Sequence, residues 1–122
     1  MKQWHKSASL REATRFAIRG IVVAGKREQN VRIHFLVAIL VVCALVFLRA
    51  SVLNIAIALL AIILVIGFEI INTSIELLAD LVHPEYSGVI RDVKDIAAGA
   101  VLLSSILAIL IGLLIFLSTI QS

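Results

Sequence analysis

The 122-residue sequence predicts an all-α integral membrane protein, with an N-terminal surface helix followed by three membrane-spanning helices. Hydrophobic residues make up 61% of the chain and charged residues 16%, whereas soluble domains average about 45–50% and about 25%. A soluble domain of this length exposes too much surface to hide so many apolar side chains. The composition therefore argues against a soluble fold, a disordered chain, a secreted disulfide scaffold and a nucleic-acid-binding module.

Basic residues concentrate at the N-terminus: residues 1–34 carry eight Lys and Arg but only two Glu. A helix predicted over residues 8–26 places four basic side chains within an arc of about 80°, namely Arg11, Arg15, Arg19 and Lys26. The opposite side carries apolar residues such as Leu10, Phe16 and Ile21. This pattern predicts an amphipathic helix that lies on the membrane, its basic face anchored at the headgroups or, alternatively, gripping phosphate.

Three apolar stretches follow, over residues 33–48, 50–68 and 96–122. Because a helix needs about 20 residues to cross a hydrocarbon core of about 30 Å, each stretch predicts one span. We place the spans at about 32–49, at about 52–82 with a cytoplasmic extension, and at about 93–119. Together with the surface helix they form a single membrane domain, residues 1–122.

The two connections between the spans predict the orientation. Residues 49–51 read as a tight turn, and residues 83–88 hold the only proline, which ends the second helix. Since two spans separate the N-terminus from residues 83–94, both lie on one side, and that side collects ten of the eleven Lys and Arg residues. The positive-inside rule places this side in the cytoplasm and the C-terminus outside.

A polar stripe occupies the cytoplasmic end of the second span. At helical spacing, one face carries Glu69, Asn72, Glu76 and Asp80. A solvated stripe would mix charges or pair Glu with Lys, whereas this one is acidic and amide only and repels itself without a cation. Carboxylates in a membrane are costly and usually functional, and oxygen ligands favour Mg²⁺ over zinc. The alternative is a structural polar clamp between helices.

Further polar groups fall at the same membrane depth: Glu28 before the first span, and Lys94 and Asp95 at the start of the third. Carboxylates for Mg²⁺ and a lysine for phosphate are the parts that phosphoryl transfer requires. A site at headgroup depth points to a lipid alcohol as acceptor. A small proton-coupled exporter is the competing interpretation, but it expects a carboxylate near the bilayer midplane, and Glu69 follows about 26 Å of apolar helix.

The stripe has a recognisable order. The pattern E-x-x-N-[TS]-[AS]-I-E-x-x-x-D, followed after about a dozen residues by K-D, resembles the prokaryotic diacylglycerol kinase family of small integral-membrane lipid kinases. The resemblance covers essentially the whole chain. It implies a homotrimer in the bacterial cytoplasmic membrane, with sites shared between neighbouring subunits, that uses Mg-ATP to phosphorylate a lipid hydroxyl.

The resemblance also implies roles for single residues. Glu28 and Glu76 would hold the catalytic Mg²⁺ ions, and Asn72 would support that site. Glu69 would be the base acting on the lipid hydroxyl. Three residues would lie on the side of the site that binds the nucleotide: Glu85, Lys94 and Asp95.

Three positions depart from the enterobacterial pattern of the family. Ser9 stands where an arginine is expected, Phe16 replaces a nucleotide-side tyrosine, and Ser87 replaces a histidine. Residues 28–34 and 94–101 instead resemble the Gram-positive undecaprenol kinases, and His34 belongs to that pattern. Considered alone, a histidine entering a span is more often an interfacial polar residue than a catalyst.

The acceptor lipid is expected to be undecaprenol, with diacylglycerol as the alternative. A site built for diacylglycerol would carry hydrogen-bond donors for its two ester carbonyls. A polyprenol would leave these buried donors unpaired, so such a site would bind it poorly. The second and third spans show no surplus donor for these esters.

Overall fold

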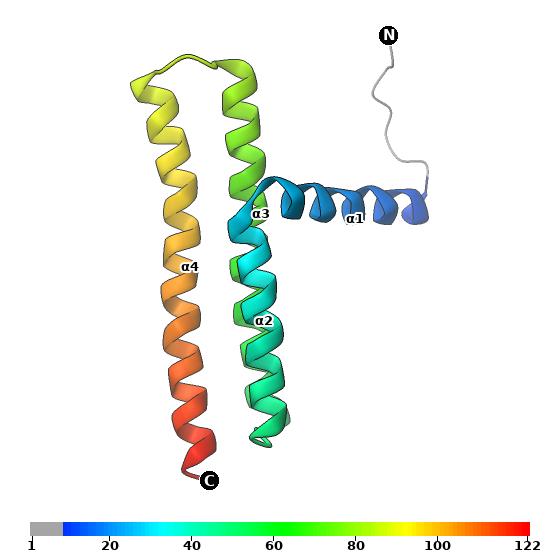
Figure 1. The fold of residues 1–122 in the computed structure, drawn as a ribbon, viewed down its shortest axis with the longest axis vertical. Coiled ribbons are helices and arrows are strands. Elements are labelled where there is room, and N and C mark those ends of the chain that lie inside the picture. The colour runs from blue at the N-terminus through cyan, green and yellow to red at the C-terminus, as the bar shows by residue number, and fades with distance from the viewer. Residues whose placement is uncertain (1–8) are drawn as a thin grey trace.

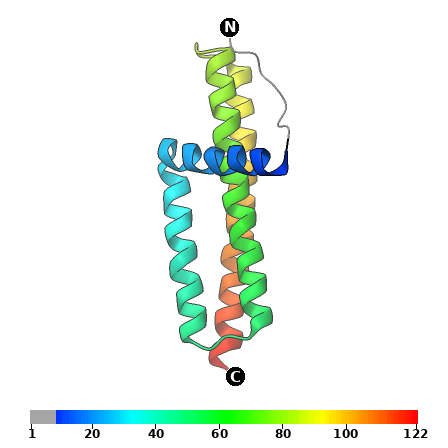
Figure 2. The ribbon, with the colours of Figure 1, turned by 90° about the vertical axis from the view of Figure 1, so that its right-hand side faces the viewer.

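The computed structural model describes residues 9–122, which form four helices joined by short connections. The helices are α1 (Leu10–Arg27), α2 (Gln29–Phe47), α3 (Val52–Val82) and α4 (Gly88–Ile120). Helices α2, α3 and α4 run side by side, and α1 extends away from them sideways, meeting the bundle at the start of α2 (Figures 1 and 2). Lys2 and Lys6, part of the predicted basic N-terminus, lie outside the described residues.

Within residues 9–122, three helices are long and apolar enough to cross a membrane, namely α2, α3 and α4. This confirms the predicted all-helical chain with three apolar spans. Helices α3 and α4 have 31 and 33 residues, so at about 1.5 Å per residue both exceed a hydrocarbon core of about 30 Å. Their joined ends project past α1 in Figure 1.

Serine side chains cap the starts of three helices. Ser9 accepts a hydrogen bond from the backbone N–H of Glu12 at 3.2 Å, and Ser51 caps α3 in the same way at 3.1 Å. Ser87 caps α4 at 3.5 Å, so that this helix begins at Gly88, ahead of the expected start of the span near residue 93. Ser9 and Ser87, two of the departures from the enterobacterial pattern, thus have a local role as N-caps.

The turn between α2 and α3 is tight because Arg49 adopts the left-handed backbone conformation, with a φ of 55°. This residue reverses the chain while its N–H bonds the carbonyl of Val46 at 3.1 Å. The next N–H, of Ala50, reaches the carbonyl of Leu45 at 2.9 Å. Both bonds satisfy carbonyls at the end of α2 that the helix itself leaves without partners.

Helix α3 is the centre of the bundle. It packs against α4 along its length and against α2, whereas α2 and α4 contact each other only sparsely. Small residues such as Ala58, Ala61 and Ala79 are buried on α3 and let the neighbouring helices approach closely. Most large apolar side chains are exposed, as expected where lipid is the surrounding medium.

Candidate functional site

The middle of α3 buries polar side chains. Glu69, Asn72 and Thr73 are only 3%, 8% and 2% exposed. The hydroxyl of Thr73 donates to the backbone carbonyl of Glu69 at 2.9 Å. This hydrogen bond does not involve the Glu69 carboxylate. One and two turns further on, Glu76 is half-buried and Asp80 is exposed. The predicted polar stripe therefore begins inside the bundle and emerges toward the free end of α3.

Glu28 is fixed at the corner between α1 and α2. Its backbone is extended, with φ −115° and ψ 120°, and its N–H closes α1 by bonding the carbonyl of Ala24 at 2.9 Å. Arg32 on α2 donates to the carbonyls of Gly25 at 2.8 Å and Lys26 at 3.3 Å. A cation at a helix C-terminus is favourable, so Arg32 stabilises the bend that positions Glu28.

The bend brings Glu28 to α3. The Glu76 carboxylate lies close enough to Glu28, Glu69 and Lys94 to interact electrostatically with all three. Asn72 donates from its Nδ2 to Glu76 Oε1 at 3.5 Å. We call the group formed by Glu28, Glu69, Asn72 and Glu76 the carboxylate–amide cluster. The cluster contains three carboxyl groups, and Lys94 is the basic side chain that interacts with Glu76.

The carboxylate–amide cluster has the donors that a hard cation prefers. Asn72 Oδ1 is buried and accepts no hydrogen bond within residues 9–122. Among residues 9–122, no group of three or more His, Cys, Asp or Glu side chains is placed so that it could hold a metal ion by itself. Mg²⁺ does not need one, because it keeps several water ligands and binds through one or two carboxylates plus substrate phosphates. Two close carboxylates and an unpaired amide oxygen fit that requirement.

An ion pair between Lys94 and Asp80 joins α4 to the end of α3. The basic partner of the stripe, which α3 itself lacks, thus comes from the neighbouring helix. Both side chains remain partly or largely exposed, at 35% for Lys94 and 64% for Asp80. Exposed pairs of this kind contribute little to stability, so an anion could replace Asp80 as the partner of Lys94 at small cost.

Two predicted nucleotide-side residues lie apart from the cluster. Asp95 follows Lys94 about 100° further around α4 and is exposed. Glu85 is exposed in the connection of residues 83–87. A single chain therefore links Glu28, Glu69, Asn72, Glu76, Asp80 and Lys94 through charge interactions, a hydrogen bond and an ion pair, and the roles of Asp95 and Glu85 stay predictions.

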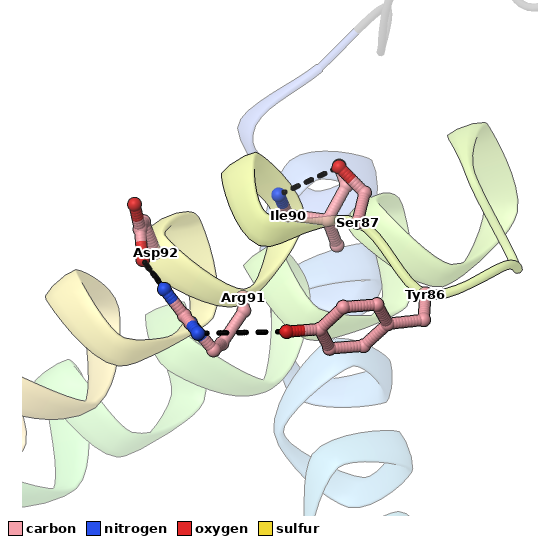
Figure 3. A network of polar contacts seen from close by, with 5 residues as sticks. All are labelled: Tyr86, Ser87, Ile90, Arg91 and Asp92. Carbon is pink, nitrogen blue, oxygen red and sulfur yellow. Dashed lines mark hydrogen bonds and ion pairs between the residues drawn. The ribbon is translucent and has the colours of Figure 1, made fainter.

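A separate polar network stiffens the start of α4 (Figure 3). Arg91 pairs with Asp92 at 3.0 Å and donates to the Tyr86 hydroxyl at 3.4 Å. The Ser87 cap lies between these partners in the sequence. These contacts connect the segment that carries Glu85 to the first turn of α4, a feature that the sequence pattern did not reveal.

Comparison with known proteins shows the family of this chain. The family model described as "Prokaryotic diacylglycerol kinase" matches residues 15–116. The chain belongs to the prokaryotic diacylglycerol kinase family. This confirms the resemblance inferred from the polar stripe, and the matched range contains every residue of the carboxylate–amide cluster.

Two curated members of this prokaryotic diacylglycerol kinase family can be compared directly. A diacylglycerol kinase from Synechocystis is 34% identical over 110 residues, which cover 89% of this chain but 63% of that protein. An undecaprenol kinase from Bacillus subtilis is 33% identical over 99 residues, covering 81% of this chain and 80% of that protein. No solved structure matches the chain at a significant level. The family and both names indicate a lipid kinase in a multi-pass membrane protein.

Proposed function

We propose that this chain is an ATP-dependent lipid kinase that transfers the γ-phosphate of Mg-ATP to the hydroxyl of a membrane lipid alcohol. The observation that carries the proposal is the carboxylate–amide cluster, formed where the α1–α2 corner meets α3. Family membership supports the lipid acceptor, and the exposed Lys94 beside the cluster supports a phosphate-bearing donor. A purely structural clamp accounts less well for a buried amide oxygen that has no partner in the described chain.

The residues of the cluster would have different roles in phosphoryl transfer. Glu28 and Glu76 would hold Mg²⁺, and the Asn72 amide would support them. The metal neutralises charge on the transferring phosphates when it is bound. Glu69, the most buried carboxylate, lies on the membrane side of the cluster, where a lipid hydroxyl arrives, so we assign it as the general base.

The nucleotide would bind toward the free end of the α3–α4 hairpin. Lys94 faces the phosphates, and Asp95 and Glu85 contact the rest of ATP. Since Asp95 and Glu85 lie apart from the cluster within one chain, a site shared between the subunits of a homotrimer accounts for them better than a monomer does. A second chain would also cover polar groups that are costly to expose to lipid.

The membrane arrangement follows from the charges. We propose that α1 is amphipathic and lies on the inner surface of the bacterial cytoplasmic membrane, with the N-terminus in the cytoplasm and the C-terminus outside. Single cysteines at Ser87 or Ser122 in a Cys43→Ala background test this in intact cells. Only the Ser122 variant should react with an impermeant thiol reagent, and labelling at Ser87 alone would reverse the orientation.

Undecaprenol is our preferred acceptor and diacylglycerol the alternative. The test is kcat/KM for undecaprenol and for dioleoylglycerol, measured with purified protein and Mg-ATP in one detergent. We expect transfer to both, with undecaprenol favoured. A diacylglycerol preference of about tenfold or more, near the discrimination that one unpaired buried group supplies, would overturn the acceptor assignment. Absence of transfer to either lipid would overturn the kinase assignment.

A further inference from the structure

An apolar groove of about 350 Å³ lies directly below the carboxylate–amide cluster. Helix α3 forms its floor because it packs against both neighbours, and α2 and α4 form walls that scarcely touch each other. Small side chains on all three helices leave this space, among them Ala38, Ala61, Ala108 and Gly112. Well-packed interiors leave few voids of this size, so such a groove needs an explanation.

Two side chains break the aliphatic lining of the groove: His34 on α2 and Ser105 on α4. Imidazole and hydroxyl groups can each donate and accept a hydrogen bond. Polar groups surrounded by hydrocarbon are costly unless they are satisfied, so their presence in this lining points to a ligand with a polar end.

Ser105 lies at the depth of Glu69, and His34 lies about one helical turn further from the free end of α3. Helices α3 and α4 are antiparallel, and their register is set by the Asp80–Lys94 pair. Glu69 precedes Asp80 by eleven residues and Ser105 follows Lys94 by eleven residues. Glu69 and Ser105 therefore lie at the same level. The tight turn joins Leu48 at the end of α2 to Val52 at the start of α3. His34 precedes Leu48 by fourteen residues and Ile66 follows Val52 by fourteen, so His34 and Ile66 lie at the same level.

Ile66 lines the groove and precedes Glu69 by one helical turn, or about 5 Å along the axis. The polar end of the groove is therefore continuous with the buried carboxylate of the cluster, and the aliphatic part extends away from it toward Ala58.

We propose that this groove receives the hydrocarbon chain of the acceptor lipid and that His34, assisted by Ser105, positions the acceptor hydroxyl at Glu69. The inference rests on the proposed kinase function. Pockets for small molecules span about 300–1,000 Å³, and this groove, at the lower end of that range, has room for part of a hydrocarbon chain. Its acceptor class is an alcohol whose single chain follows directly on the hydroxyl, as in a polyprenol.

Filling the groove tests the position of the chain. Ala38→Phe places a large ring in the groove, while Ala44→Phe adds the same ring to an exposed position of α2 outside it. We expect Ala38→Phe to raise KM for undecaprenol about tenfold or more, with KM for ATP unchanged, as expected when a binding contact is lost. Equal effects of the two variants would overturn the groove assignment.

Substitution of His34 tests the positioning role. His34→Ala should lower kcat/KM for undecaprenol about tenfold, the effect of one lost hydrogen bond, without changing KM for ATP. His34→Gln should restore most of the activity because its amide keeps a donor and an acceptor. A merely structural histidine would change lipid and ATP kinetics together and gain nothing from Gln, and that outcome would overturn the role.

A binding measurement separates this inference from the kinase function. Farnesol carrying a photoreactive group at the end of its chain should crosslink to groove residues in the wild type and in Ala44→Phe, but not in Ala38→Phe. This result supports the groove even if no lipid is phosphorylated. Phosphorylation without crosslinking in the groove would leave the kinase and overturn the inference. Loss of oligomers in Ala38→Phe, with no crosslink in the wild type, would instead assign the groove to a second copy of the chain and overturn the inference as well.

Discussion

The two halves of α3 reverse the burial pattern of soluble proteins. In the half from residue 69 to 80, Glu69 and Asn72 are buried, whereas in the half from 52 to 66 large residues such as Leu60 and Ile63 are 71% and 64% exposed. Lipid accommodates aliphatic side chains at no cost but leaves polar groups without partners. The buried start of the polar half lies against the α1–α2 corner and α4, whereas Asp80 near its end is exposed, and the apolar half can tolerate an open groove.

The same contrast separates two chemical tasks on one rigid helix. The polar half carries the side chains to which we assign Mg²⁺ and phosphate binding, and the apolar half offers hydrocarbon surface. Because both belong to one continuous helix, the distance between them is fixed by helical geometry rather than by a flexible connection. Substitutions in each half should therefore affect different steps of the reaction.

The largest effect is expected from removing a charge in the polar half. Glu76→Gln keeps the side-chain volume but loses a proposed Mg²⁺ ligand, so kcat should fall about 10³-fold or more while the protein stays folded. Glu28→Gln should behave alike. Asp92→Asn, exposed on α4 and outside the carboxylate–amide cluster, is the matched control and should stay within threefold of wild type. Activity of Glu76→Gln close to that of the control would contradict the metal assignment.

A smaller effect should distinguish Lys94 from its ion-pair partner. Lys94→Ala should raise KM for ATP about tenfold or more, because a phosphate-facing cation is lost. Asp80→Asn breaks the same ion pair but keeps the lysine, so it should change KM for ATP less than about threefold. Equal changes in steady-state kinetics would show that the pair itself, rather than the free ammonium group, is what matters.

The corner that closes the polar half depends on Arg32. Arg32→Gln removes the cation from the last carbonyls of α1, which should lower the free energy of unfolding by about 1 kcal/mol. Because Glu28 sits at this corner, kcat should fall as well, by less than in Glu28→Gln. Thermal unfolding in detergent and initial rates check the two effects. Unchanged values for both would show that packing alone holds the bend.

The smallest effects are expected at the helix caps. Ser51→Ala at the start of α3 should cost about 1 kcal/mol of stability, and Ser87→Ala about 0.5 kcal/mol because its hydrogen bond is longer. Neither should change KM for ATP or lipid. Chemical denaturation of the two variants side by side checks the order, and a larger loss in Ser87→Ala would reverse it.

Hydropathy and helical spacing predicted the strongest features of the molecule. The three apolar spans follow from runs of residues without charge, and the shared face of Glu69, Asn72 and Glu76 follows from residues three and four apart. Both are local patterns. The Ser9–Glu12 cap was equally local, since Ser-x-x-Glu is a capping signal, but the prediction of a helix from residue 8 did not use it.

Other features depend on how the helices pack. The Asp80–Lys94 pair depends on the register of α3 against α4, which the connection and the Ser87 cap determine. The groove depends on alanines and a glycine from three helices facing one another, and no single segment reveals that arrangement. The nucleotide-side roles of Asp95 and Glu85 were implied by the family resemblance and stay predictions.

The overhang of the α3–α4 hairpin beyond α1 has a kinetic consequence. At the proposed site, a water-soluble nucleotide would approach the projecting end seen in Figure 1 from the aqueous phase, whereas a lipid alcohol would diffuse laterally within the bilayer to the side of the bundle. Two routes through different solvents do not block each other. Neither substrate then has to bind first, and the reaction should proceed through a ternary complex with random order of addition.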